Sequence, residues 1–254
     1  MRDVAPLRGQ VAIVTGAAQG IGRGIALVLA EAGASIVIGD LKDATGTVRE
    51  IETAGGSAAA SMLMDVSRPD EADGLVTFAL GRHGRLDILV NNAGIDAPRG
   101  NASDLPDEAW RRTIDVNLSG VFYCSRAALR PMLAAGRGAI VNVSSQVARV
   151  GRPGLSPAYN ASKAGLIRLT VAFSAQVADH GVRVNAIMPG LVESRDFGWS
   201  AEQRATRTAE YPLGLGTPSD VGEAVLYLVS PAGRWVSGTA LQVTGGYQRP
   251  GPWL

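Results

Sequence analysis

The sequence predicts one α/β domain in which a doubly wound parallel sheet of about seven strands carries helices on both faces. Short apolar runs bounded by turn residues alternate with segments of helical periodicity, as expected when strands and helices follow one another along the chain. Glycines stand where helices should end, and prolines stand where helices should begin. At 254 residues the chain fits a single hydrophobic core, so we expect one domain over residues 1–254.

The apolar runs are expected to form buried strands. They cover residues 11–15, 35–40, 58–64, 86–91, 139–143, 182–188 and 240–243. Helices are expected at residues 22–31, 69–82, 106–133, 159–179 and 218–228. The segment 191–217 fits this pattern worst, because it mixes glycines and prolines with one short helical piece near residues 200–209. We interpret it as a mobile flap over the active site.

Charge and composition exclude several classes of function. The chain has 24 basic and 23 acidic side chains, a balance that favours neither nucleic acid nor an anionic membrane surface. No stretch reaches the roughly 20 consecutive apolar residues of a membrane helix, and the first residues lack an apolar signal segment. Two histidines and one cysteine offer no metal-ligand spacing. We expect a soluble, cytoplasmic protein without a metal ion, whose partner is a small molecule.

A glycine-rich turn joins the first expected strand to the first expected helix. Gly16, Gly20 and Gly22 follow the strand directly. Glycine permits close approach of the backbone, and the helix N-terminus offers free amide groups and a partial positive charge to a pyrophosphate. The spacing Gly-x3-Gly-x-Gly differs from the commoner Gly-x-Gly-x-x-Gly. Taken alone, the turn indicates either a dinucleotide site or a tight connection between a strand and a helix.

Tyr159 and Lys163 stand four residues apart on an expected helix, so their side chains share one face. Oxidation of an alcohol needs a base that takes the hydroxyl proton while hydride leaves the carbon, but a free tyrosine has a pKa of about 10. An ammonium group beside the phenol favours tyrosinate and lowers that pKa. Taken alone, the pair is more typical of the exposed face of an amphipathic helix.

Ser144 and Ser145 follow the apolar run at 139–143, which places a hydroxyl where open α/β sheets bind ligands. A nucleophilic serine is not expected, because no histidine lies in a neighbouring motif and no Gly-x-Ser-x-Gly turn surrounds these serines. Ser144 stays a minor alternative to Ser145.

These motifs together resemble those of the short-chain dehydrogenase/reductase family. They occur in the family's order and span almost the whole chain: Thr15-Gly-Ala-Ala-Gln-Gly-Ile-Gly22, Asn91-Asn-Ala-Gly94, Asn117, Ser145, Tyr159-Asn-Ala-Ser-Lys163, Pro189-Gly190 and Val243-Thr-Gly-Gly246. The resemblance implies a Rossmann-like fold in which Tyr159 is the general acid/base and Ser145 donates to the substrate oxygen. It further implies that Lys163 holds the nicotinamide ribose and that Asn117 holds a water linking Lys163 to solvent. The alternative for Asn117 is a hydrogen bond within its own helix.

The resemblance implies a nicotinamide dinucleotide, and we expect NAD. Asp40 ends the second expected strand 24 residues after Gly16, where a carboxylate accepts hydrogen bonds from both ribose hydroxyls and repels a 2′-phosphate. Gln19 and Leu41 stand where NADP-binding relatives often carry basic residues. Lys42 opposes this preference, and a capping role for Asp40 is the alternative.

By the same resemblance, the dinucleotide contacts lie at strand ends and in the turns that follow. Asp65 is expected to contact the adenine amino group while Val66 packs on the ring, although Asp65 is almost as well placed to cap the next helix. The complete set is Gly16, Gln19, Gly20, Ile21, Gly22, Asp40, Leu41, Asp65, Val66, Asn91, Ala93, Gly94, Tyr159, Lys163, Pro189, Gly190, Val192 and Ser194.

Three features depart from the family pattern. The segment between Ser145 and Tyr159 is one residue longer than usual, and Thr244 replaces an aspartate. Ser194 replaces a threonine but keeps the hydroxyl, so its expected contact with the nicotinamide carboxamide is retained.

Polar and aromatic residues are expected to line the substrate pocket. They are Gln146, Asp96, Arg152, Glu193, Trp199 and Tyr211. The mixture suits a polyol, a sugar or a hydroxylated ring. The resemblance also implies a homotetramer that pairs through the helices at 106–133 and 159–179. The tail at 249–254 is expected either to reach a neighbouring subunit or to be disordered.

We therefore expect an NAD-dependent oxidoreductase that moves a hydride between nicotinamide and a secondary alcohol or ketone. One alternative is an NADPH-dependent carbonyl reductase. The other is a catalytically silent dinucleotide-binding sensor or scaffold, against which the intact Ser145, Tyr159 and Lys163 count.

Overall fold

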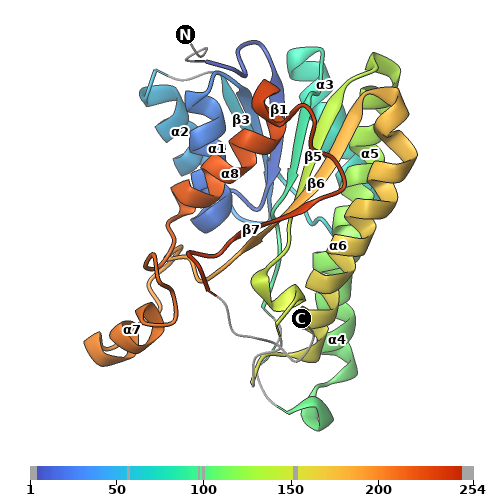
Figure 1. The fold of residues 1–254 in the computed structure, drawn as a ribbon. Coiled ribbons are helices and arrows are strands. Elements are labelled where there is room, and N and C mark those ends of the chain that lie inside the picture. Colours follow the sequence, from blue (N-terminus) through green and yellow to red (C-terminus); the bar gives the residue numbers. More distant parts are fainter. Residues whose placement is uncertain (1–4, 56–57, 97, 99–100, 151–153, 248–254) are drawn as a thin grey trace.

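The predicted doubly wound parallel sheet is confirmed. The structure is a computed structural model, and it describes residues 5–55, 58–96, 98, 101–150 and 154–247. Over this part of the chain, parallel strands form one sheet in the order β3-β2-β1-β4-β5-β6-β7 (Figure 1). The strands are β1 Val11–Thr15, β2 Ser35–Asp40, β3 Ala59–Leu63, β4 Ile88–Asn91, β5 Gly138–Val143, β6 Val182–Pro189 and β7 Ala240–Val243.

The strand order reverses at β1, because the chain proceeds from β1 through β2 to β3 and then crosses to β4 on the other side. At such a point the connections that leave neighbouring strands diverge to opposite faces and open a crevice at the carboxyl ends of the strands. The glycine turn after β1 and the Asn91-Asn-Ala-Gly94 motif after β4 therefore border the same crevice.

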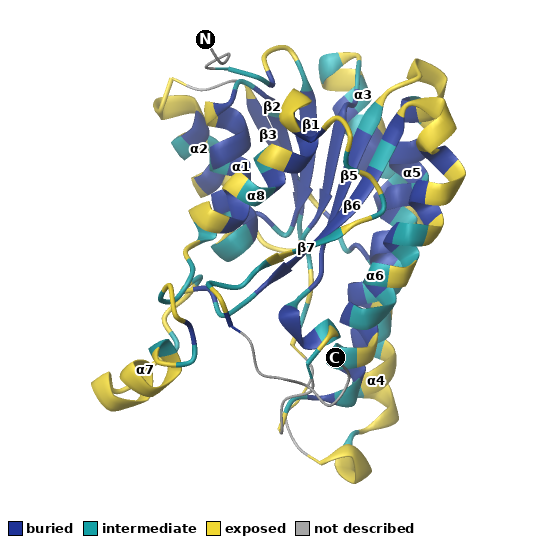
Figure 2. Cartoon of the chain, in the orientation of Figure 1, coloured by how far each residue is buried: buried dark blue, intermediate teal, exposed yellow. Residues whose placement is uncertain are grey.

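Helices cover both faces of the sheet. They are α1 Gly20–Glu31, α2 Thr45–Thr53, α3 Pro69–His83, α4 Asp107–Ile114, α5 Gly120–Ala135, α6 Pro157–Val177, α7 Ala201–Thr208 and α8 Pro218–Val229. Figure 2 shows α1 and α8 on one side of the buried sheet and α5 and α6 on the other. Alternate residues of β1 serve the two cores, since Ala12 and Val14 pack with the first group and Val11 and Ile13 with the second. None of the helices in the described ranges is both long and apolar enough to cross a membrane.

Two helical features differ from the sequence-based expectation. The helix expected at 106–133 is divided into α4 and α5 by a π-helical turn, Asp115–Ser119. Helix α2 was not expected, because only Thr47 and Ile51 of its residues are buried and its apolar periodicity is correspondingly weak.

The expected flap, residues 191–217, leaves the end of β6 and returns to the same place. An isolated bridge pairs Val192 with Gly216, and the Gly216 amide donates to the carbonyl oxygen of Leu191 at 3.1 Å. Between these points α7 stands away from the body of the molecule, and nearly all of its residues are exposed (Figures 1 and 2). The two ends of the segment are thus held to each other, while α7 at its tip is exposed.

Candidate active site

A cavity of about 880 Å³ lies at the carboxyl ends of β5 and β6, beside the start of α6. Ser145 follows β5 and Tyr159 lies in the first turn of α6, and both line the cavity. A side-chain hydrogen bond joins the two hydroxyl groups. Ser144 is placed differently, because it is buried and its Oγ donates to the carbonyl oxygen of Lys163 at 2.7 Å. The structure therefore brings Ser145, and not Ser144, to the expected general acid/base.

Lys163 lies one helical turn beyond Tyr159, as its spacing predicts. Its Nζ donates a 2.9 Å hydrogen bond to the carbonyl oxygen of Val143 and lies 5.7 Å from the centre of the Tyr159 ring. Complete burial lowers the pKa of the Lys163 ammonium to about 8. Sequence reasoning alone judged this pair more typical of an exposed helix face, but Lys163 is buried and Tyr159 is partly buried at the cavity.

The proton affinity of Tyr159 is set mainly by its burial, which raises the pKa of the phenol to about 12. The carboxylate of Asp96 raises this pKa further, whereas the hydrogen bond with Ser145 and the guanidinium of Arg195 lower it. In the chain alone, the phenol is therefore protonated at neutral pH, and a base role requires additional positive charge near its oxygen.

Asn117 lies in the π-helical turn, a distortion that recurs at functional sites. Its side chain is fully buried and holds the loop after β4, accepting from the Ile95 amide at 2.8 Å and donating to the Ile95 carbonyl oxygen at 2.9 Å. The amide also donates to Ser162 Oγ at 3.3 Å. A Cβ placed on Gly94 would lie 3.3 Å from Asn117 Oδ1 and 3.4 Å from Lys163 Nζ, so these groups are neighbours.

The glycine turn is held tightly against the motif after β4. Asn92 Nδ2 donates to the carbonyl oxygens of Thr15 and Gly16 at 3.0 and 2.9 Å. Gly16 has a φ of +66°, and a Cβ there would lie 2.7 Å from Ala93 Cα. A Cβ on Gly22 would collide with the carbonyl oxygen of Gly16 and with Asn92 Nδ2. These glycines are required by close backbone approach, as expected for a cofactor turn.

The N-terminus of α1 opens into the crevice. No side chain caps it, and its first turn carries no acidic residue, so its amide donors are not satisfied by an internal anion. An uncapped helix terminus at the strand-order reversal fits the pyrophosphate of a dinucleotide.

Asp40 lies beside this turn, at the end of β2. Its Oδ2 accepts from the Ala18 amide and its Oδ1 from the Lys42 amide, each at 2.9 Å. Lys42 Nζ lies 3.3 Å from Gln19 Oε1. Each carboxylate oxygen keeps a lone pair for a ribose hydroxyl.

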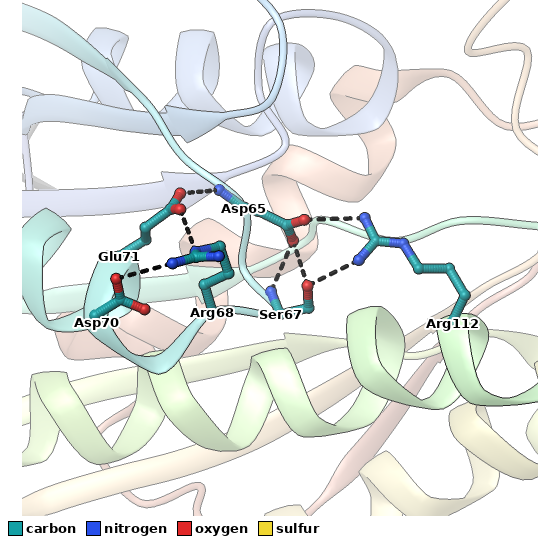
Figure 3. Close-up of polar contacts among 6 residues, drawn as sticks. All are labelled: Asp65, Ser67, Arg68, Asp70, Glu71 and Arg112. Carbon is teal, nitrogen blue, oxygen red and sulfur yellow. Dashed lines mark hydrogen bonds and ion pairs between the residues drawn. The ribbon is translucent and has the colours of Figure 1, made fainter.

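The carboxylate of Asp65 is occupied by a network that the sequence did not predict (Figure 3). Its Oδ1 accepts from the amide and hydroxyl of Ser67 at 2.9 and 2.7 Å, and its Oδ2 pairs with Arg112 Nη2 at 3.0 Å. Burial acts against ionisation, but the contacts with Ser67 and Arg112 outweigh it and lower the pKa of Asp65. Asp65 therefore holds the turn before α3, and Oδ2 keeps one lone pair for another donor.

The side chain of Asn91 points into the interior. It is buried, and its Nδ2 donates to Ser125 Oγ and to Asn142 Oδ1, both at 2.9 Å. Asn92, its neighbour, holds the glycine turn. Successive side chains at the end of a strand point to opposite sides, so Asn91 and Asn92 have different partners. The motif alone does not show which of the two asparagines points which way.

The other expected cofactor residues lie in different surroundings. Ile21, Gly190 and Val192 line the cavity. Leu41 is exposed, and Val66 is buried.

Part of the expected substrate pocket is brought together. Asp96, Gln146 and Trp199 line the cavity, whereas Arg152 lies outside the described residues. Glu193 does not line it and instead pairs with Arg204 on α7, at 2.9 Å through both oxygens.

Tyr211 does not line the cavity either, because it lies behind Gln146. Gln146 Nε2 donates to the Tyr211 hydroxyl at 2.7 Å, and the Tyr211 ring stacks on that of Tyr247.

Sequence reasoning missed several cavity residues. Chief among them are Ser156, Arg195, Phe197 and Arg207. Arg195 and Phe197 stand one and three positions after Ser194, so their closeness in sequence to the expected cofactor motif was the available signal. Within the described ranges, no group of His, Cys, Asp and Glu is placed to hold a metal ion.

The chain is similar to known oxidoreductases over nearly its whole length. A family model described as enoyl-(acyl carrier protein) reductase matches residues 16–248. The cis-4-hydroxycyclohexanecarboxylate dehydrogenase of Sinomonas cyclohexanicum is 43% identical over 240 residues, which cover 94% of this chain and 96% of that protein. The cyclohexanol dehydrogenase of an Acinetobacter strain is 38% identical over 241 residues, covering 94% of each chain.

Two further matches are a reductase and a solved structure. A 3-oxoacyl-[acyl-carrier-protein] reductase of Vibrio cholerae is 38% identical over 243 residues, covering 94% of this chain and 98% of that protein. A solved structure of a short-chain type dehydrogenase/reductase from Mycobacterium marinum superposes with a TM-score of 0.91 at 34% identity, covering 98% of this chain and 99% of that chain.

Proposed function

The chain belongs to the short-chain dehydrogenase/reductase family, an oxidoreductase class acting on alcohols and ketones, and from this premise we propose that it is an NAD-dependent dehydrogenase of ring-borne secondary alcohols. The observation that carries the proposal is the meeting of Ser145, Tyr159 and Lys163 at one cavity beside the dinucleotide crevice. The same groups serve the reverse reduction of the ketone.

In the proposed mechanism, Tyr159 takes the hydroxyl proton of the alcohol and Ser145 donates a hydrogen bond to the same oxygen. The oxidised nicotinamide, when bound, supplies the hydride acceptor and a positive charge. Since burial raises the pKa of Tyr159 to about 12, the Lys163 ammonium has the task of favouring tyrosinate. Asn117 is proposed to keep a water-linked proton path from Lys163 open, and it fixes the loop beside Gly94 for that role.

NAD is favoured over NADP by the charges around the adenosine end. Asp40 would lie beside a 2′-phosphate and repel it. Arg23, which follows the glycine turn, is already paired with Glu50 on α2. Lys42 is the observation that favours the alternative, an NADPH-dependent carbonyl reductase, because its ammonium lies over Gln19 at the same end of the crevice.

A ring-borne alcohol is favoured by the cavity walls and by two relatives. Phe197 and Trp199 stack with ring centres 4.4 Å apart and line the cavity, offering an apolar surface to a saturated ring. The Sinomonas and Acinetobacter enzymes are both named for alcohols on a six-membered ring.

A homotetramer is part of the proposal. Large apolar side chains stay exposed on the helices expected to pair, with Trp110 of α4 at 42% and Phe122 of α5 at 38% exposure. Light scattering on the purified protein tests this assembly directly.

The proposal is tested by a panel of substrates with both cofactors. Cyclohexanol, cis-4-hydroxycyclohexanecarboxylate, a linear polyol and an aldose are each offered with NAD and NADP while formation of reduced cofactor is followed. A 3-oxoacyl thioester is offered with NADH and NADPH while oxidation of the cofactor is followed. The ring alcohols with NAD should give the highest kcat/KM. Turnover restricted to 3-oxoacyl thioesters with NADPH would establish the reductase instead. Tight NAD binding without any turnover would indicate the silent sensor.

A further inference from the structure

An ion pair crosses the mouth of the active-site cavity. Asp96 belongs to the loop after β4 and Arg195 to the flap, and Arg195 Nη2 lies 3.0 Å from Asp96 Oδ2. Both residues line the same cavity as Ser145 and Tyr159. Ninety-nine positions separate them in the sequence, so the pair joins two segments that are far apart in the chain.

Arg195 also organises the flap beyond the ion pair. Its guanidinium lies 5.3 Å from the centre of the Phe197 ring, and Phe197 stacks on Trp199 with an interplanar angle of 10°. The ion pair with Asp96, the contact with Phe197 and the stack on Trp199 thus follow one another along the start of the flap.

The two charges act on Tyr159 in opposite directions. The Asp96 carboxylate raises the pKa of the phenol and the Arg195 guanidinium lowers it. Lys163 faces the phenol from its own helix, and Asp196 and Arg207 are the other charged residues that the described part of the chain contributes to the cavity lining.

We propose that Asp96 and Arg195 are positioning residues whose ion pair holds the start of the flap over the cavity and balances the charge that the Tyr159 hydroxyl experiences. The proposal rests on the proposed role of Tyr159 as general acid/base. It assigns to one pair two separable effects, one on substrate affinity and one on the pH at which the enzyme becomes active.

The expected pH effects have opposite signs. Alcohol oxidation requires tyrosinate, so with saturating NAD kcat/KM for the alcohol rises with pH and levels off above the apparent pKa of Tyr159 in the enzyme–NAD complex. Asp96→Asn removes a negative charge and leaves Arg195 unbalanced, so the rising limb moves to lower pH. Arg195→Gln leaves Asp96 unbalanced, so the limb moves to higher pH. A shift of roughly half a pH unit in each variant corresponds to about a threefold change in kcat/KM on the limb.

The double variant separates the two effects. Removing both charges restores the balance, so the pH profile of Asp96→Asn/Arg195→Gln should return to that of the wild type. The ion pair is lost in all three variants, so KM for the ring alcohol should rise in each of them. A purely structural role would raise KM without moving the limb in opposite directions.

Arg204→Gln is the matched control. Arg204 is also on the flap and also forms an ion pair, with Glu193, but it does not line the cavity. Its substitution removes the same charge from the same segment and should leave the limb in place.

The measurement is kcat and kcat/KM for cyclohexanol oxidation with saturating NAD between about pH 6 and pH 10, for the wild type and four variants. Shifts of opposite sign that shrink in about 1 M salt, where screening reaches about 3 Å, support the proposal. Shifts of one sign, no shift, or an equal shift in Arg204→Gln overturn it. If Tyr159→Phe is inactive while the limb does not move, the proposed function stands and only this inference fails.

Discussion

The carboxylate of Asp40 accepts a 2.9 Å hydrogen bond from the backbone amide of Ala18, inside the glycine turn that precedes α1. A second bond from the Lys42 amide fixes the other oxygen. The carboxylate is therefore held in one orientation beside the turn proposed to bind the pyrophosphate, and a phosphate on the neighbouring ribose carbon would approach a fixed negative charge.

This relationship predicts the cofactor preference. At an effective dielectric constant of about 20, two unit charges about 4 Å apart repel by roughly 4 kcal/mol, and even a third of that gives about a tenfold preference for NAD. Asp40→Ser should lower the ratio of kcat/KM with NAD to kcat/KM with NADP, mainly by improving kcat/KM with NADP. Lys42→Gln should raise the same ratio. A wild-type enzyme that prefers NADP would contradict both the cofactor assignment and the role of Asp40.

The packing of the glycine turn predicts a loss of stability in Gly22→Ala. The added Cβ meets the Gly16 carbonyl oxygen and Asn92 Nδ2, and overpacking of this kind costs about 1–3 kcal/mol. Gly81→Ala is the matched control, because Gly81 is also helical but has nothing within 4 Å of the added Cβ. That variant should gain up to about 1 kcal/mol from helix propensity. Urea unfolding measures both, and equal effects would show that the turn can relax.

The Asp65 network predicts that Arg112 supports binding of the adenine end. Arg112→Met removes the contact that orients the Asp65 carboxylate, which is proposed to meet the adenine amino group. The affinity for NAD should therefore fall about fivefold, the equivalent of one hydrogen bond, with kcat nearly unchanged. Calorimetry should show weaker binding of AMP and unaltered binding of nicotinamide mononucleotide.

Arg111→Met serves as the control for this comparison, since Arg111 lies beside Arg112 on α4 and forms an exposed pair with Asp107. Equal losses for AMP and nicotinamide mononucleotide would assign Arg112 a general structural role.

The flap predicts a ligand-dependent change in protection. Its base is fixed by Val192 and Gly216, whereas α7 is exposed along its length. Hydrogen exchange at residues 191–217 should slow when NAD and an unreactive ring alcohol analogue bind together. The same exchange rates with and without both ligands would make this segment a static loop.

Local sequence patterns predicted the strand and helix order well, because burial and turn chemistry leave direct traces in the chain. Strand ends were predicted less well: a strand was expected from residue 86, but β4 begins at Ile88, since pairing with neighbouring strands decides where a strand begins and ends. The division between α4 and α5 left no such trace, because Asp115–Ser119 continues the helical pattern and only the extra residue of a π-turn distinguishes it.

In the candidate site too, the sequence predicted contacts between residues that are close in the chain and missed contacts between residues that are far apart. Tyr159 and Lys163 share a helix, so their spacing predicted their proximity. The contacts of Arg112 with Asp65 and of Arg195 with Asp96 join residues 47 and 99 positions apart, and no local pattern encodes such pairs. The burial that dominates the pKa of Tyr159 likewise comes from the whole fold and not from its neighbours in sequence.

The most direct test of the account is the turnover of Tyr159→Phe with cyclohexanol and NAD. The substitution keeps the ring and removes the hydroxyl that exchanges the proton, so kcat should fall by at least about 10²- to 10⁴-fold, while the dissociation constant for NAD stays within about twofold of the wild type. A variant that binds NAD normally and keeps more than about a tenth of wild-type turnover would contradict the assignment of Tyr159 as the general acid/base.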